Sequence, residues 1–172
     1  MTISCEIEKC LFNSVDNIVD EIIRTISNAT SRIYVMHFWF SWKPIADALI
    51  SAHKKGVKVN VLTDQRSLVK YMEDSQTTYS LSVPEYLHNN GIKRISIYFN
   101  HILHHKVIIS DDVVMTGSLN LFKKSIYGDT ESIIFIKSEN ICKFYTKEFE
   151  SIFKNSLELQ RAMDAIKDQP RD

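Results

Sequence analysis

Residues 104–120 read HHKVIISDDVVMTGSLN, which is two short apolar runs separated by a pair of acids. The runs are rich in β-branched residues and are too short for helices, so the segment predicts a β-hairpin that turns at the acids. Residues two apart in a strand share a face, so His104 and Lys106 point the same way. The hairpin brings them near the polar end of its second strand, where Ser118 and Asn120 lie.

This convergence predicts a binding site for a phosphate group. Lys106 supplies positive charge, Ser118 and Asn120 supply hydrogen-bond donors, and His104 supplies a nucleophile or a proton carrier. Gly117 lets the backbone approach a ligand closely, because glycine has no side chain.

The residues before the hairpin predict alternating helices and strands. Apolar residues at 15, 18, 19, 22, 23 and 26 have helical spacing, and residues 44–56 form a second helix that ends at Gly56. The β-branched and aromatic runs 32–40 and 57–64 read as strands, and residues 3–12 could form another. A short helical crossover between two strands favours a parallel pair.

The remaining elements complete a mixed α/β fold. Residues 65–82 show no clear period and are predicted as loop with some helix. Residues 83–91 predict a short helix, residues 92–99 and 132–137 predict strands, and apolar residues from Ile141 to Leu157 share one helix face. We therefore expect one α-β-α sandwich domain, residues 1–159, with a mixed β-sheet flanked by helices, followed by a frayed tail, residues 160–172.

Composition narrows the possible functions. The chain has 172 residues, and its 21 basic and 21 acidic residues cancel, so any anion site must be local. Three cysteines without a CxxC pair favour a reducing compartment. No apolar run approaches the roughly 20 residues that span a bilayer, and the first residues lack a signal-peptide pattern. We expect a cytoplasmic protein, encoded by a bacterium or phage, without stable membrane association.

The hairpin residues also match a known motif. The pattern His104-x-Lys106-x4-Asp111 followed by Gly117-Ser118-x-Asn120 resembles the HKD motif of the phospholipase D superfamily. Residues 32–64 resemble that superfamily's first strand, helix and second strand, and the resemblance extends over residues 3–155. Five residues separate Asp111 from Gly117 where the usual pattern has six, so either Asp111 or Asp112 could be the motif's aspartate.

The resemblance implies a role for each motif residue. His104 is expected to be the nucleophile that forms a phosphohistidine, and Lys106 and Asn120 are expected to hold phosphate oxygens. Ser118 would bond within the site, and Asp111 would be structural. Glu131 follows Asn120 by eleven residues, as in the small bacterial nucleases of the family, and would orient the ring of His104.

The superfamily builds one site from two motifs, and this chain carries one. The resemblance therefore implies a homodimer with a shared active site. It also implies chemistry without metal or cofactor, because the lysines supply the positive charge that a metal ion would otherwise provide. A small member with one motif most resembles the nuclease branch, which predicts a non-specific endonuclease acting on DNA or RNA. The alternatives are a lipid hydrolase acting on a cardiolipin-like substrate and a non-catalytic module that binds phosphate or nucleic acid.

Four further residues are candidates for substrate contact. Lys123 and Lys124 follow the motif and could bind flanking phosphates or form a solvated helix face. Phe40 and Trp42 end the first predicted strand of the motif's sheet and could stack on bases, although packing in the core is the more frequent fate of such rings. The other histidines near the motif, among them His105, are expected to be structural.

Overall fold

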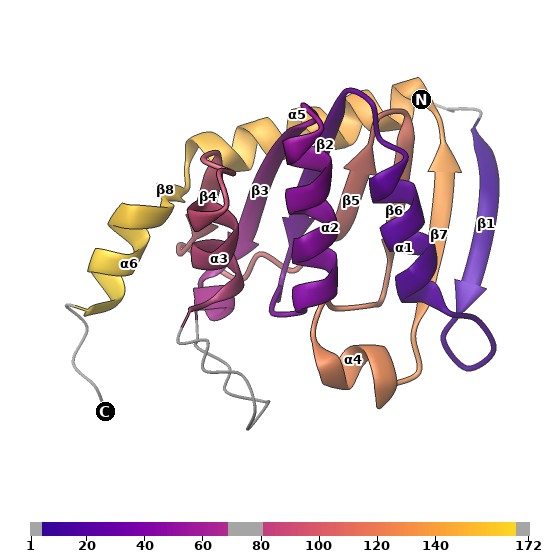
Figure 1. The fold of residues 1–172 in the computed structure, drawn as a ribbon, viewed down its shortest axis with the longest axis horizontal. Helices are drawn as coiled ribbons and strands as arrows, with labels where there is room; N and C mark the ends of the chain where they lie inside the picture. Colours follow the sequence, from indigo (N-terminus) through magenta and orange to yellow (C-terminus); the bar gives the residue numbers. More distant parts are fainter. Residues whose placement is uncertain (1–4, 69–80, 168–172) are drawn as a thin grey trace.

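The computed structural model describes residues 5–68 and 81–167, and these form a mixed β-sheet with helices on both faces (Figure 1). This confirms the predicted fold class. The sheet has eight strands in the order β1-β7-β6-β5-β2-β3-β4-β8. The strands are β1 (Glu6–Phe12), β2 (Arg32–His37), β3 (Lys58–Asp64), β4 (Ile95–Tyr98), β5 (Lys106–Ser110), β6 (Val113–Gly117), β7 (Ser132–Lys137) and β8 (Leu157–Glu158). The helices are α1 (Ile18–Ser27), α2 (Lys43–Lys54), the 3₁₀ helix η1 (Gln65–Leu68), α3 (Val83–Asn89), α4 (Lys123–Tyr127), α5 (Glu139–Lys154) and α6 (Leu159–Lys167).

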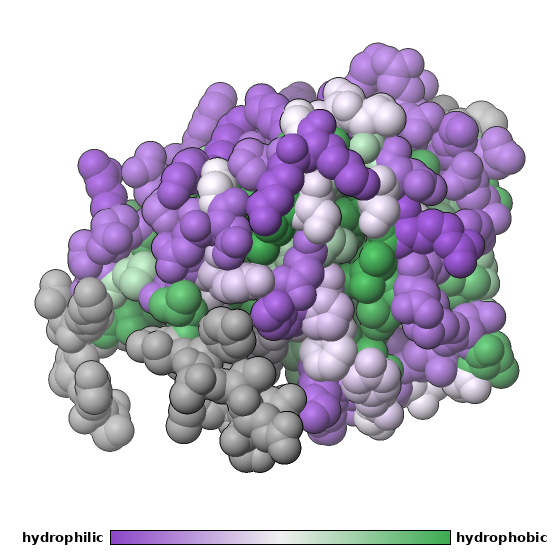
Figure 2. Space-filling model, viewed as in Figure 1, coloured by the Kyte–Doolittle hydropathy of each residue, from purple (hydrophilic) through white to green (hydrophobic). Residues whose placement is uncertain are grey.

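Two apolar clusters fill the layers on either side of the sheet. Strand β5 shows the alternation directly, because Ile108 belongs to the cluster beneath α1 and α2, whereas Val107 and Ile109 belong to the cluster beneath α5. Figure 2 shows that the outer surface over α1 to α3 is mainly hydrophilic, with hydrophobic residues in the spaces between elements. Polar outer faces and buried inner faces are what a sandwich of this kind requires.

The predicted strand pairings are present. Strands β2 and β3 are parallel, and β5 and β6 form the expected antiparallel hairpin, with Val107 opposite Thr116 and Ser110 opposite Val113. Asp111 begins the turn with a φ of 52°, which an aspartate tolerates better than most residues.

Several strand ends meet at one edge of the sheet. Strands β2 and β6 end there, at His37 and Gly117, while β5 and β7 begin there, at Lys106 and Ser132. His37 lies opposite Lys106, and Gly117 lies opposite Ile133. Short helix α4 lies beyond this edge (Figure 1). His104 and Lys106 at the start of the hairpin, and Ser118 and Asn120 after its second strand, are therefore brought to the same edge of the sheet.

The predicted frayed tail is wrong over residues 160–167. Helix α6 spans Leu159–Lys167, and Leu159 and Ala162 are buried in the apolar cluster that also contains residues of β4. Leu159, Ala162, Met163 and Ile166 have regular helical spacing, so the signal for this helix was present in the sequence and the prediction missed it. Residues 168–172 lie outside the described residues, as do residues 69–80 of the segment predicted as loop with some helix. The strand expected within residues 3–12 is β1, at an edge of the sheet.

Candidate active site

His104 and Lys106 converge as their spacing predicts. The Nζ atom of Lys106 lies 3.3 Å from Nε2 of His104 and 3.3 Å from its carbonyl oxygen. An ammonium group only donates hydrogen bonds, so Nε2 is the accepting nitrogen in this contact and Nδ1 carries the proton. Burial lowers the pKa of Lys106, and the carboxylate of Glu131 acts in the opposite direction. The imidazole itself is exposed and faces solvent with its basic nitrogen beside a cation.

Glu131 lies beneath the end of β6 and organises the segment that follows it. Its side chain is buried, with 8% of the residue exposed, and its two carboxylate oxygens accept hydrogen bonds from the hydroxyls of Ser118 and Ser125. Ser118 Oγ also accepts from the backbone N–H of Ser132 at 3.1 Å. The two contacts show that Glu131 fixes the segment that carries Ser118. That Glu131 also orients the ring of His104, as the family resemblance implies, stays a prediction.

Asn120 is held through its backbone and leaves its side chain available. Its N–H donates to Ser125 Oγ at 2.9 Å. Its Oδ1 atom is buried and has no hydrogen-bond partner among residues 5–68 and 81–167. A buried polar atom without a partner costs about 1–3 kcal/mol, so it fits a position that a ligand or a second chain completes.

An aromatic and cationic surface adjoins His104. The ring centroid of Phe38 lies 4.9 Å from that of His104. Lys106 Nζ lies 5.3 Å and Arg66 Cζ 5.4 Å from the centroid of the same Phe38 ring, which are cation–π distances. Trp39, which follows Phe38, and Phe122, which precedes α4, have ring centroids 4.8 Å apart. Phe38, Trp39, Phe122 and Arg66 are all partly exposed. Sequence reasoning did not single out Phe38, Phe122 or Arg66, whereas Trp39, like Phe40 and Trp42, was a candidate for stacking on bases.

The two predicted stacking residues are placed differently. Phe40 is fully buried, and its backbone N–H donates to Ser67 Oγ at 3.0 Å. A bridge between Phe40 and Leu121 turns its ring into the core, so the prediction that Phe40 contacts substrate is wrong. Trp42 is partly exposed but packs against the core and edge-to-face on Tyr127, with centroids 5.5 Å apart.

Lys123 and Lys124 open helix α4 at the same edge of the sheet. Both are exposed, and Lys124 Nζ lies 3.8 Å from a carboxylate oxygen of Asp129. Their contact with substrate stays a prediction.

Asp111 lies at the opposite end of the hairpin from His104. Its carboxylate accepts hydrogen bonds from the backbone N–H groups of Thr30, Ser31 and Arg32, and from the Thr30 hydroxyl. Partial burial alone would raise the pKa of Asp111, but these hydrogen bonds outweigh it and lower the pKa. Asp112 is exposed, and its carboxylate lies 3.9 Å from Lys137 Nζ. Asp111 is thus the aspartate that fastens the hairpin to the segment before β2.

A buried acid supports the segment that leads into the motif. Asp64, at the end of β3, is fully buried. It accepts from the N–H of Leu103 at 3.0 Å and from the guanidinium of Arg66 at 2.8 Å. Asp64 therefore fixes the residue before His104. Its sequence signal was an acid at the end of the strand predicted over residues 57–64.

Clustered metal ligands and membrane-spanning helices are both absent from the described part of the chain. In residues 5–68 and 81–167, no three side chains among His, Cys, Asp and Glu are grouped as ligands for a metal ion. Within the same residues, every helix is too short or too polar to cross a bilayer.

The amino-acid sequence of this chain is similar to those of known proteins. A family model described as "Cardiolipin synthase, PLD-like domain" matches residues 22–153. Mitochondrial cardiolipin hydrolase of Xenopus tropicalis is 27% identical over 146 residues, which are 84% of this chain and 65% of that protein. Phospholipase D of Rickettsia prowazekii (strain Madrid E) is 30% identical over 131 residues, 76% of this chain and 60% of that protein. The chain spans between half and two thirds of the length of these curated relatives.

Solved structures show the same fold. Nuc from Salmonella typhimurium, described as a phospholipase D family member, has a TM-score of 0.75 at 22% identity, covering 90% of this chain and 98% of that one. NucT from Helicobacter pylori has a TM-score of 0.74 at 17% identity, covering 91% and 100%. The family model spans most of the chain and includes His104, Lys106, Asn120 and Glu131. With this match and with His104 and Lys106 in contact at the sheet edge, the chain belongs to the phospholipase D superfamily.

Proposed function

We propose that this protein is a metal-independent phosphodiesterase that cleaves DNA or RNA with little sequence preference. The observation that carries the proposal is the contact of the exposed His104 imidazole with the Lys106 ammonium, beside partly exposed aromatic rings. In this proposal two copies of the chain contribute one His104 each to a shared active site.

The chemistry has two steps. Nε2 of His104 holds the lone pair and attacks phosphorus, and the bond from phosphorus to the leaving oxygen breaks while the partner subunit's His104 protonates that oxygen. That second imidazole, now neutral, takes a proton from water as the water oxygen attacks phosphorus. The nitrogen–phosphorus bond then breaks and returns His104. Lys106 and the amide of Asn120 stabilise the charge on the phosphate oxygens.

The surroundings of His104 favour a nucleic acid. Partly exposed rings such as Phe38 offer faces on which bases stack, and Arg66 and Lys106 lie against that same ring. Because the chain has no net charge, binding of a polyanion depends on such local cations, to which Lys123 and Lys124 would add.

A phospholipid is the second candidate substrate. The observation that favours it is the similarity to proteins named mitochondrial cardiolipin hydrolase and phospholipase D. The histidine chemistry is the same for either diester, so the substrate must be decided by experiment.

The test compares substrates and one matched variant pair. Wild-type protein in excess EDTA is incubated with plasmid DNA, single-stranded DNA, RNA and cardiolipin vesicles. We expect cleavage of nucleic acid in EDTA, its loss in His104→Ala, and its retention in His88→Ala, which changes a histidine on α3. Brief reaction with labelled substrate should leave phosphate on His104. Cleavage of vesicles alone would select the lipid, and unchanged nuclease activity in His104→Ala would contradict the proposed nucleophile.

A further inference from the structure

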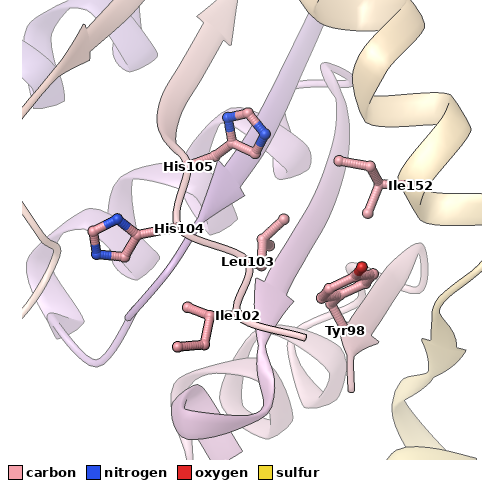
Figure 3. A pocket seen from close by; sticks show the side chains of 6 residues that line it. All are labelled: Tyr98, Ile102, Leu103, His104, His105 and Ile152. Carbon is pink, nitrogen blue, oxygen red and sulfur yellow. The ribbon is translucent and has the colours of Figure 1, made fainter. Parts of the chain in front are cut away.

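A hollow of about 420 Å³ lies next to His104 on the side toward α5. Figure 3 shows the rings of His104 and His105 projecting in different directions from one segment, with the other side chains arranged around the space beside them. The hollow is lined by Tyr98, Ile102, Leu103, His104, His105 and Ile152. Its volume is within the range of roughly 300–1,000 Å³ found for small-molecule sites.

The walls combine flat or apolar surfaces with a few polar groups. Ile102 and Ile152 contribute aliphatic surface, and Tyr98 contributes a ring with a hydroxyl group. Ile102 is 56% exposed although it is a large apolar residue. It lines the hollow, where an exposed apolar side chain can contact a ligand.

The half-buried imidazole of His105 is a polar group in the wall of the hollow. Burial lowers the pKa of His105, against the opposing effect of the Glu148 carboxylate and with smaller lowering effects from Lys106 and His104. A neutral imidazole offers one donor and one acceptor, which matches the mixed edge of a nucleobase.

The charges favour an uncharged occupant. None of the six lining residues carries an ammonium or guanidinium group, and the carboxylate of Glu148 acts on His105. Lys106, which contacts His104, is the cation that can hold the reacting phosphate, and the hollow itself adds no further cation for a second one. A hydrocarbon chain would leave the imidazole and the tyrosine hydroxyl without partners, which is costly when they are desolvated.

We propose that this hollow is a nucleobase subsite, which holds the base of a nucleotide bonded to the scissile phosphate at His104. The base packs between Tyr98 and the two isoleucines and hydrogen-bonds to His105. The inference rests on the proposed nuclease function and adds the part of the substrate that sets affinity. Every base has a stacking face and both donors and acceptors on its edges, so such a subsite is compatible with low sequence preference.

The test compares two chromogenic diesters that share a leaving group. Methyl p-nitrophenyl phosphate has no base, whereas the 5′ and 3′ p-nitrophenyl phosphate esters of thymidine carry one on either side of the phosphate. We expect wild-type protein to show a KM at least about tenfold lower for one thymidine ester than for the methyl ester, as base stacking provides.

Three variants locate this preference. Ile102→Ser removes a largely exposed wall, and Ile152→Trp fills the hollow from α5. Each should reduce the KM ratio severalfold. Ile7→Ser is the matched control, since Ile7 is 60% exposed on edge strand β1, away from the hollow, and it should keep the wild-type ratio.

The outcomes separate the inference from the proposed function. If wild type cleaves nucleic acid without preferring either thymidine ester, or if both Ile102→Ser and Ile152→Trp keep the preference, the subsite is refuted while the nuclease stands. If only cardiolipin vesicles are cleaved, the proposed function fails and the subsite fails with it. Loss of vesicle hydrolysis in Ile102→Ser would then assign the hollow to the lipid.

Discussion

The imidazole of His37 is buried in β2, and His37 pairs with Lys106 of β5. Burial lowers the pKa of His37 to about 3, the positive charge of Lys106 adds to this effect, and a hydrogen bond with the Trp39 backbone opposes it. His37 is therefore neutral at physiological pH. A neutral ring there adds no positive charge beside Lys106, which lets the lysine remain charged despite its own partial burial.

This assignment predicts how stability depends on pH. The unfolded chain binds a proton at His37 below about pH 6.5, whereas the folded chain does so only near pH 3. Stability should therefore fall as pH decreases through this window, by about 1.4 kcal/mol per pH unit at most from this residue. His37→Leu should make the free energy of unfolding in urea depend less on pH between 7 and 4.5. His101→Leu, at an exposed histidine, is the control, and an unchanged slope in His37→Leu would contradict the assignment.

The contact of His104 with Lys106 was predictable from sequence, because residues two apart in extended backbone share a face and His104 lies two residues before β5 begins at Lys106. Ser118 and Asn120 follow the end of β6, so their predicted place depended on the pairing of the hairpin strands. Phe38 and Arg66 were not predictable, because both follow the end of a strand, where the alternation stops and the backbone direction depends on tertiary contacts. Phe40 illustrates the same limit, since its burial depends on a bridge to Leu121 more than 80 positions along the chain.

The hairpin β5–β6 is the element that carries the motif, and Asp111 fastens its turn. Asp111→Asn should destabilise the protein by about 1–3 kcal/mol at pH 7, because the amide replaces one accepting oxygen by a donor that faces backbone N–H groups. Asp112→Asn should change stability little, since Asp112 is exposed. Urea unfolding of the two variants measures the difference, and equal stabilities would contradict the role of Asp111.

Acid should reduce this difference in a defined direction. The pKa of Asp111 is lowered in the folded protein relative to its ordinary value of 3.8. The stability that it contributes is therefore present above about pH 4 and is lost as pH falls through the lower folded value. Comparing wild type with Asp111→Asn at pH 7 and at pH 3 should show the gap between them narrowing.

Helix α4 places two cations beside the site, and they can be tested together. Replacing Lys123 and Lys124 by Ala should weaken binding of a DNA oligonucleotide and reduce the slope of log affinity against log salt by about one to two units. Methyl p-nitrophenyl phosphate, which has no flanking phosphates, should be cleaved at a nearly unchanged rate. Lys54→Ala with Lys55→Ala, at the far end of α2, is the matched control. Equal losses on both substrates would assign these lysines to the fold or to the reacting phosphate.

At the scale of elements, the sequence was informative wherever a helix or strand has a strong period. Strands β2, β3, β5, β6 and β7 and helices α1, α2 and α5 follow from such patterns. Helix α6 was missed although Leu159, Ala162, Met163 and Ile166 have helical spacing, so that miss was not forced by the sequence. Strand β8 has only two residues and its pairing depends on β4, so it has no local signal of its own.

Each chain contains one complete motif. Under the proposed mechanism it therefore supplies only one of the two imidazoles that the reaction needs. One chain offers a single His104 at the site edge, and the proposed reaction needs a nucleophile and a separate proton donor. Asn120 Oδ1, buried without a partner in the described part of the chain, is a further sign of a surface that something else completes. A two-fold axis that passes beside the hairpins would supply the second imidazole.

The last prediction is therefore that the active species is a homodimer with a mass of about twice 20.0 kDa. Sedimentation at micromolar concentration measures that mass. Wild-type and His104→Ala chains are then unfolded together in equal amounts and refolded, so that dimers form at random. If each site needs both histidines, activity should fall to about one quarter of the all-wild-type value, because only dimers of two wild-type chains are complete. Mixing with His88→Ala should leave activity unchanged. A fall to one half would mean that each chain acts alone, and a fully active 20.0 kDa monomer would contradict the shared site.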